Sequence, residues 1–353
     1  MKNILWNLLF ALFAICWQGS VSAQEKAALY GLSNYRIPLD SKGAVIGSAV
    51  TSFGENPPEM VLLKDTSGIF TVDKKGILRL KKSAKVKATD QVFRYGITLK
   101  FGDVPVEFEL VKDEFIKNKV VAHRGAWKNH PAHENSLSAL KYAIEIGAEA
   151  SEFDVWMSAD NIPIVCHNAS VGDKMIEQTT AKDLQKISLG NGDFVPTLRQ
   201  YLEAIKSQNK TQLVLEIKSS EISQERSLAL TDAVVQMVHE LKVQAWVDYI
   251  SFNYGVLARI RELDPVAKTA YLSGDKSCEE LAADKVSGID YPFHSFHNDE
   301  GLAGKAHQLG LSVNVWTVDK EDELRYFLNA GADQITTNEP EQLLKILNET
   351  SKK

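Results

Sequence analysis

The chain has 353 residues, of which 44% are hydrophobic and 24% are charged, with a formal net charge of −6. These values are ordinary for a globular protein and leave room for two domains and a sizeable core. The acidic balance, with no basic run, argues against nucleic acid as a partner. Three cysteines, only two of them beyond residue 23, offer no disulfide framework.

The first 23 residues differ in character from the rest of the chain. Lys2 precedes an apolar stretch, which ends in the small and polar residues QGSVSA. This order is typical of a secretory signal peptide, here cut after Ala23, and the apolar part is too short for a membrane span. Cys16 raises a lipoprotein alternative, but Ile15 stands where such signals usually have a small residue. We therefore expect export to the periplasm or outside a bacterial cell, with no stable membrane span in the mature chain.

Residues 24–115 alternate apolar with polar side chains, and Gly or Asp turns separate the alternating runs. This pattern is typical of strands and hairpins, so we predict a small all-β sandwich. The phrases GIFTVDKKGILRL and YGITLKF resemble cadherin-like modules, whose acidic calcium-binding signatures are absent here. The resemblance therefore implies only the fold of this domain. We expect no metal site in it, and its partner is left open.

From residue 116 to residue 353, short β-rich runs alternate with helical segments. The eight predicted strands are 119–123, 150–155, 212–218, 247–252, 267–272, 288–292, 311–318 and 333–337. The predicted helices lie within 134–147, 196–208, 224–242, 253–263, 299–310, 320–331 and 339–347. This alternation predicts an α/β domain with a (β/α)8 TIM barrel. Residues 168–196 are the longest interruption, and we expect a loop or short helical insert there.

Charged and polar residues gather where the predicted barrel strands end. Glu152 and Asp154 are two residues apart on one strand, so their side chains point to the same face. Glu216 and Lys218 repeat this spacing on the next strand. His123 and Arg124 end the first strand, and His167 follows another apolar run. Because barrel active sites form at the carboxyl ends of the strands, these residues predict one site.

The residue types indicate what such a site could do. Three converging carboxylates repel one another unless a positive charge joins them, and oxygen ligands suit Ca²⁺ or Mg²⁺. Two histidines can act as general acid and base near neutral pH. A metal ion together with Arg124 and Lys218 suits a phosphoryl group. The alternative is that each residue is a solvated rim or core group; the repeated spacing argues against it.

The barrel segment resembles the glycerophosphodiester phosphodiesterase family across residues 119–349. The resemblance lies in VVAHRG, ENS, EFDVWMSADNIPIVCHN, LEIK, VNVWTV and ITTNEP. It implies a TIM barrel that hydrolyses a small-molecule glycerophosphodiester to an alcohol and sn-glycerol 3-phosphate with Ca²⁺ or Mg²⁺. By position it implies that His123 and His167 are the catalytic pair and that the metal ligands are Glu152, Asp154 and Glu216. It also implies that Arg124 and Lys218 contact the phosphate, that Trp316 packs on the glycerol side, and that Glu134 is a further acid near the site.

Some features depart from the family pattern or stay open. Asn168 follows His167 where the family usually has Asp, which bears on the pKa of that histidine. Asp290 ends the sixth predicted strand and is given no role. Two alternatives remain: a related phosphodiesterase that acts on inositol phosphodiesters or phospholipid head groups and releases a cyclic product, and a barrel that binds phosphodiesters without turnover. The leaving alcohol, the preferred metal, the nucleophile, the acid and base assignments and the oligomeric state are all left open.

Overall fold

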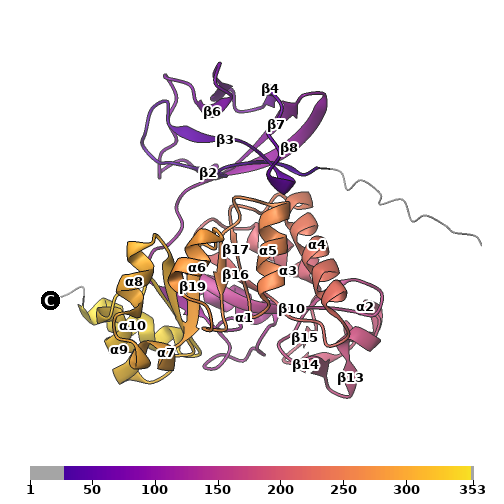
Figure 1. Ribbon diagram of the computed structural model, residues 1–353, viewed down its shortest axis with the longest axis vertical. Helices are drawn as coiled ribbons and strands as arrows, with labels where there is room; N and C mark the ends of the chain where they lie inside the picture. Colours follow the sequence, from indigo (N-terminus) through magenta and orange to yellow (C-terminus); the bar gives the residue numbers. More distant parts are fainter. Residues whose placement is uncertain (1–27, 351–353) are drawn as a thin grey trace, which may run out of the picture.

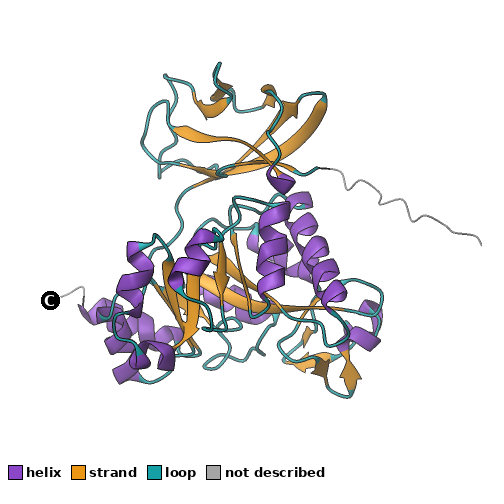
Figure 2. Ribbon diagram, viewed as in Figure 1, coloured by secondary structure: helices purple, strands orange, loops and turns teal. Residues whose placement is uncertain are grey.

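The computed structural model describes residues 28–350, which form a β-sandwich followed by a barrel (Figures 1 and 2). The expected signal peptide, with its lipoprotein alternative at Cys16, lies outside the described residues. Within residues 28–350, no helix is both long enough and apolar enough to cross a membrane.

The sandwich consists of two four-stranded sheets, so the all-β prediction is confirmed. One sheet has the order β1 (Tyr30–Leu32), β3 (Val45–Thr51), β6 (Ile77–Leu80) and β5 (Phe70–Val72). The other has the order β2 (Arg36–Ile37), β8 (Val104–Lys112), β7 (Arg94–Phe101) and β4 (Met60–Asp65). Every second residue of β7 is buried, as expected for a strand with one face on a core. The cadherin-like resemblance stays a prediction.

Eight parallel strands close into a barrel, as the sequence predicted. In order they are β9 (Val120–Ala122), β10 (Ala150–Met157), β16 (Gln212–Ile217), β17 (Val247–Ser251), β18 (Thr269–Tyr271), β19 (Gly288–Pro292), β20 (Ser312–Trp316) and β21 (Gln334–Thr337). Pairing of β21 with β9, and of β9 with β10, closes the ring. The register pairs Asp154 with Glu216, so the carboxylates of two neighbouring strands lie at one level.

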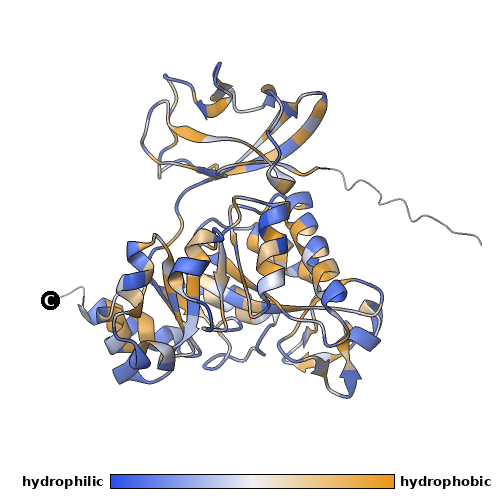
Figure 3. Cartoon of the chain, viewed as in Figure 1, coloured by the Kyte–Doolittle hydropathy of each residue, from blue (hydrophilic) through white to orange (hydrophobic). Residues whose placement is uncertain are grey.

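Helices cover the outside of the barrel and show their apolar residues toward the strands (Figure 3). They are α1 (Leu137–Glu145), α3 (Leu198–Ile205), α4 (Gln224–Glu240), α5 (Tyr254–Leu263), α6 (Cys278–Ala283), α7 (Phe293–Asn298), α8 (Leu302–Gln308), α9 (Glu321–Asn329) and α10 (Pro340–Thr350). The helices α6 and α7 were not predicted, because six residues are too few to show apolar periodicity. The capping box of Ser277 and Glu280 was the available signal for α6.

The segment 168–196 holds more structure than the loop or short helical insert expected from the sequence. It forms two small hairpins, a 3-10 turn and a short helix: β12 (Ser170–Val171), β13 (Lys174–Met175), η2 (Ile176–Gln178), α2 (Ala181–Leu184), β14 (Ser188–Gly190) and β15 (Asp193–Phe194). Its buried side chains form a separate cluster with Trp156 and Ile164. The segment lies on the side of the barrel away from the sandwich (Figure 1).

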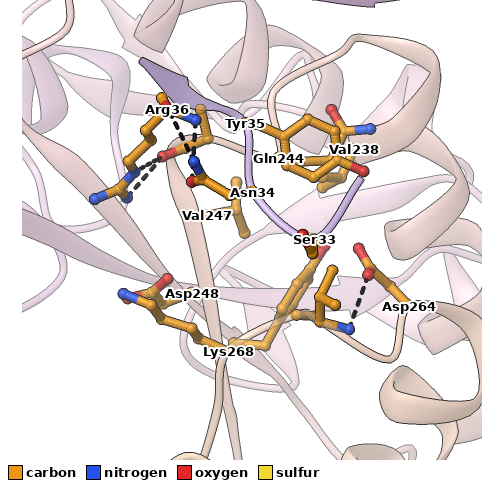
Figure 4. Close-up of a pocket in the computed structure, with 14 residues that line it drawn as sticks. Ser33, Asn34, Tyr35, Arg36, Val238, Gln244, Val247, Asp248, Asp264 and Lys268 are labelled. Carbon is orange, nitrogen blue, oxygen red and sulfur yellow. Dashed lines mark hydrogen bonds and ion pairs between the residues drawn. The ribbon is translucent and has the colours of Figure 1, made fainter. Parts of the chain in front are cut away.

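The sandwich docks on the amino-terminal ends of the barrel strands. The Arg36 guanidinium donates to the carbonyl of Ala245 at 2.7 and 2.9 Å and to Gln212 Oε1 at 2.6 Å. It also lies 4.0 Å over the ring of Phe115. A pocket remains beside this contact, with Tyr35 and Arg36 on the sandwich side (Figure 4). The carboxyl ends of the strands are therefore left free for a site.

Candidate active site

A cavity opens at the carboxyl ends of the barrel strands, and most of the predicted site residues line it. The lining residues are His123, Arg124, Glu152, His167, Glu216, Lys218, Ile250, Phe252, Leu272, Asp290, Trp316, Thr317 and Thr336. Seven of the nine predicted residues are among them. The other two lie behind the wall: Asp154 is buried, and Glu134 contacts Arg124. The structure thus brings together predicted residues that are up to 193 positions apart in the sequence, from His123 to Trp316.

The three acids form a compact group at one side of the cavity. One carboxylate oxygen from each of Glu152, Asp154 and Glu216 lies within 4.8 Å of the others. Burial and the charges of Asp154 and Glu216 raise the pKa of Glu152 well above its usual range. Burial and the charge of Asp154 raise the pKa of Glu216 to about 8. A divalent cation bound between such crowded, buried carboxylates would offset their mutual repulsion and favour their ionised forms.

Lys218 supplies positive charge to this group. Its Nζ lies 2.8 Å from Asp154 Oδ1 and 2.7 Å from Glu216 Oε1. Asn135 Nδ2 donates to Asp154 Oδ2 at 2.8 Å from the other side. Burial opposes ionisation of Asp154, but Lys218, His167 and Asn135 together hold its pKa below the usual range. Asp154 is therefore the fixed anion of the three acids.

His123 is held by an amide, which sets its tautomer. His123 Nδ1 lies 2.9 Å from Asn338 Oδ1. Asn338 donates its Nδ2 to Asp319 Oδ2 at 2.9 Å, so its oxygen faces the histidine and must accept. Nδ1 then carries the proton, and Nε2 is left unprotonated in the neutral ring. Burial and the charge of Arg124 lower the pKa of His123, which keeps the ring neutral at neutral pH.

His167 follows β11 (Pro163–Val165), a short strand antiparallel to β10. Its Nδ1 lies 2.9 Å from Asn168 Oδ1, the residue that departs from the family pattern. Burial lowers the pKa of His167, and the charge of Asp154 opposes this shift. Since Asn168 is neutral, it orients the ring without adding the negative charge that an Asp would contribute.

Arg124 joins the histidine and the acids through its backbone and side chain. Its backbone N–H donates to Glu152 Oε2 at 2.8 Å, and its Nη1 donates to Glu134 Oε2 at 2.9 Å. The residue has a φ of 57°, which turns the chain sharply after His123. Its buried Nε has no hydrogen-bond partner among the described residues. This Nε lies 4.0 Å from Asp154 Oδ2, so Glu134 and Asp154 together orient the Arg124 guanidinium.

The wall on the far side of the cavity is aromatic and apolar. Trp316 and Phe252 meet edge to face, with ring centroids 5.6 Å apart. Trp316 Nε1 donates to the carbonyl of Asp290 at 2.7 Å, which fixes the indole. Ile250 and Leu272 complete this wall. It offers a surface for the carbon skeleton of a ligand.

Several residues that orient the site were not predicted from the sequence. Asn135 and Asn338 hold Asp154 and His123, and Asp319 holds Asn338. Both asparagines stood in segments noted for the family resemblance, ENS and ITTNEP, but an isolated amide carries no charge or spacing that marks it as functional. Phe252 and Asp290 also line the cavity without having been assigned a role.

Comparison with known proteins agrees with this geometry. A model of the glycerophosphoryl diester phosphodiesterase family matches residues 123–342. A glycerophosphodiester phosphodiesterase of Caldanaerobacter subterraneus subsp. tengcongensis is 28% identical over 247 residues, which cover 66% of this chain and 98% of that protein. A crystal structure of a glycerophosphodiester phosphodiesterase from Parabacteroides distasonis is 36% identical, covers 67% of this chain and 99% of that one, and has a TM-score of 0.65.

A more distant structure has the same fold. It is a phosphodiesterase of Oleispira antarctica in complex with the product sn-glycerol 3-phosphate. It is 23% identical, covers 65% of this chain and 96% of that one, and has a TM-score of 0.58. The family match starts at residue 123, so the sandwich lies outside the matched residues.

Proposed function

Because this chain belongs to the glycerophosphoryl diester phosphodiesterase family, we propose that it hydrolyses glycerophosphodiesters to an alcohol and sn-glycerol 3-phosphate with the help of a divalent cation. The observation that carries the proposal is the composition of one cavity. It combines Glu152 and Glu216, whose oxygen atoms lie close to those of Asp154 behind the wall, with a lysine, an arginine and two neutral histidines. The Oleispira antarctica phosphodiesterase, which shares the fold, holds sn-glycerol 3-phosphate, the product that this reaction would release.

The metal proposal rests on the donor set. Glu152, Asp154 and Glu216 would hold the ion, and their oxygen donors fit Ca²⁺ or Mg²⁺ better than Zn²⁺. A bound cation would stabilise the negative charge that develops on the phosphoryl oxygens. Lys218 bridges two of these acids, so it can neutralise them before binding and then face the phosphoryl group.

The two histidines fit the proton transfers that the reaction needs. His123 has a protonated Nδ1 fixed by Asn338, so Nε2 can take or return a proton. His167 has the matching arrangement with Asn168. One histidine would remove a proton from the attacking oxygen while the other protonates the leaving alcohol oxygen. Arg124, which lines the same cavity, would contact a phosphoryl oxygen through its guanidinium.

We also propose that the enzyme acts in the periplasm or outside the cell, after loss of the first 23 residues. This rests on the order of residues in that segment, from Lys2 to Ala23. Mass spectrometry of the exported protein tests it. A mature chain that begins at Gln24 is the expected result, while retention of the segment in the cytoplasm, or a lipid on Cys16, would contradict it.

The reaction is tested by measuring release of sn-glycerol 3-phosphate from glycerophosphodiesters of choline, ethanolamine, glycerol and inositol. Each substrate is offered with Ca²⁺, with Mg²⁺ and with EDTA, beside a Glu152→Ala variant. Metal-dependent release that this variant lacks is expected. A cyclic phosphate as the final product would point to the related phosphodiesterase chemistry. Metal binding with no turnover of any diester would point to a binding protein instead.

A further inference from the structure

A buried ion pair joins the segment 168–196 to the barrel, and the proposed reaction gives it no role. Glu177 lies in the η2 turn of that segment and is 9% exposed. Arg226 lies in the first turn of α4, 49 positions later in the sequence. Its Nε donates to Glu177 Oε1 at 2.8 Å. Loss of either partner would leave the other charge buried alone, so the pair firmly connects two loops at the open end of the barrel.

Glu177 holds the loop that follows Lys218. Its Oε1 accepts a hydrogen bond from Ser220 Oγ at 2.6 Å, and its Oε2 accepts one from the backbone N–H of Glu221 at 2.9 Å. Ser220 comes two positions after Lys218 in the chain. The backbone N–H of Lys218 itself donates to the carbonyl of Val155 on β10 at 3.1 Å. The Lys218 backbone is therefore held between β10 and the segment 168–196.

Arg226 holds the end of β10. Its Nη2 donates to the carbonyl oxygens of Ser158 at 2.6 Å and of Met157 at 3.4 Å, and its Nη1 donates to Asn161 Oδ1 at 3.3 Å. Met157 is three positions after Asp154 on the same strand. The planar guanidinium has N–H groups in fixed directions, so it can hold several acceptors at once. Through its ion pair, Arg226 thus connects the end of β10 with the loop after β16, and these two strands carry all three acids.

Lys218 needs a fixed backbone to do what the proposed function asks of it. Its Nζ lies 2.8 Å from Asp154 Oδ1 and 2.7 Å from Glu216 Oε1. To contact a phosphoryl oxygen, the ammonium must turn partly away from these carboxylates. A lysine side chain is a flexible stem of four carbons, so the place that the ammonium reaches then depends on where its backbone is held.

We propose that Glu177 and Arg226 are positioning residues, which hold the loop after β16 and thereby place Lys218 against the phosphoryl group of the substrate. The inference rests on the proposed function, in which Lys218 contacts that group, and adds the two residues that place it. Within residues 28–350, neither Glu177 nor Arg226 is among the residues that line the cavity. Their effect must therefore pass through Lys218.

The alternative is that the pair only stabilises the segment 168–196. That segment already packs through its own apolar cluster, which includes Trp156 and Ile164. An ion pair that served stability alone would not need to bind a backbone N–H after β16 and two carbonyl oxygens at the end of β10. These backbone contacts favour a positioning role.

The test is a double-mutant cycle that joins Arg226 to Lys218. The kcat/KM for glycerophosphocholine and the dissociation constant of sn-glycerol 3-phosphate are measured for the wild type, Arg226→Met, Lys218→Met and the double variant. Arg259→Met is the matched control. The Arg259 Nε lies 2.7 Å from Asp232 Oδ1 between α5 and α4, and its side chain is 15% exposed, against 18% for Arg226. Thermal unfolding is followed for every variant.

Arg226→Met should lower kcat/KM about 10- to 10²-fold, since a small displacement of a group near the reacting atoms has a cost of this order. In the Lys218→Met background the same change should cause no more than about a twofold further loss, because coupled residues are not additive. The dissociation constant should show the same pattern, which keeps the cycle readable where rates are very low. Arg259→Met should keep kcat/KM within about twofold even if it lowers the melting temperature.

Two outcomes would overturn the inference. One is an equal proportional loss from Arg226→Met with and without Lys218, which indicates a purely structural role. The other is a wild-type kcat/KM in folded Arg226→Met. If Arg226→Met does not fold, Glu177→Gln, which keeps the shape of the side chain, carries the same cycle. Failure of the proposed function looks different, because the wild type would then release no sn-glycerol 3-phosphate from any diester.

Discussion

The two ends of the barrel use charged residues in opposite ways. At the end covered by the sandwich, the Arg36 guanidinium contacts the Ala245 carbonyl, Gln212 and the Phe115 ring. At the open end, the buried Arg124 Nε makes no hydrogen bond within residues 28–350 and lies 4.0 Å from Asp154 Oδ2, and Glu152 is crowded by two other acids. The covered end uses its polar groups to stabilise the fold, whereas the open end leaves polar groups with incomplete partners that a ligand can supply. The barrel thus separates stability from chemistry along its axis.

The largest effect is expected from neutralising a carboxylate at the open end. Glu152→Gln should lower kcat on the order of 10³-fold, because a cation that stabilises developing charge loses a ligand. The same change should raise the melting temperature of the metal-free protein, because burial and repulsion destabilise the ionised Glu152. Initial rates and thermal unfolding in EDTA check both parts. If metal-free Glu152→Gln melted at a lower temperature than the metal-free wild type, the crowded carboxylates could not be a source of instability.

A smaller loss is expected when a proton-transfer group is removed. His123→Ala should lower kcat by about 10²- to 10⁴-fold, the usual contribution of a general acid or base. His133→Ala is the control, since His133 is exposed and its Nδ1 contacts only the carbonyl of Glu134 in the described chain. Steady-state kinetics on both variants tests the assignment. Near-wild-type kcat in His123→Ala would remove His123 from the reaction.

Loss of the Asn338 amide should lower kcat less than loss of His123, the histidine that this amide orients. Asn338→Leu removes the acceptor for His123 Nδ1 and should lower kcat about 10-fold, because the tautomer is no longer fixed. KM should change little, because Asn338 does not line the cavity. A kinetic comparison of kcat with KM distinguishes this role from binding. A loss confined to KM would argue against an orienting role.

The smallest effect on activity is expected at the covered end. Arg36→Met should lower the free energy of unfolding by about 1–3 kcal/mol, because the Ala245 carbonyl and Gln212 lose their donor. kcat and KM should stay within about twofold, because the change lies at the far end of the strand that carries Glu216. Urea unfolding and kinetics on one preparation check this. A large fall in kcat would show that the two ends are coupled.

The open end could largely be predicted from the sequence. Side chains two residues apart on a strand share a face, so the spacing of Glu152 and Asp154 is enough to place both acids together. The carboxyl ends of the barrel strands meet at one rim, which adds Glu216, Lys218 and His123. The alternation of short apolar runs with helical segments likewise predicted all eight barrel strands, because parallel strands that are buried on both faces consist mainly of apolar residues.

The covered end could not be predicted in this way. Arg36 is one polar residue in a sandwich strand, and its partner Gln212 is 176 positions away in sequence. No spacing links two residues on separate domains. Asp290 was given no role for a related reason: it lies within an ordinary strand, and only the closed ring of strands places it across from Glu152. The short helices α6 and α7 were too brief for a periodic signal.

The proposed function depends above all on a catalytic cation held by the three acids at the open end. The most direct measurement adds Ca²⁺ or Mg²⁺ back to EDTA-stripped enzyme and follows both heat of binding and release of sn-glycerol 3-phosphate. We expect the stripped enzyme to be inactive, the rate to rise with occupancy of one site, and Glu152→Gln to lose both signals. Full activity in the stripped enzyme, or binding that Glu152→Gln leaves intact, would contradict it.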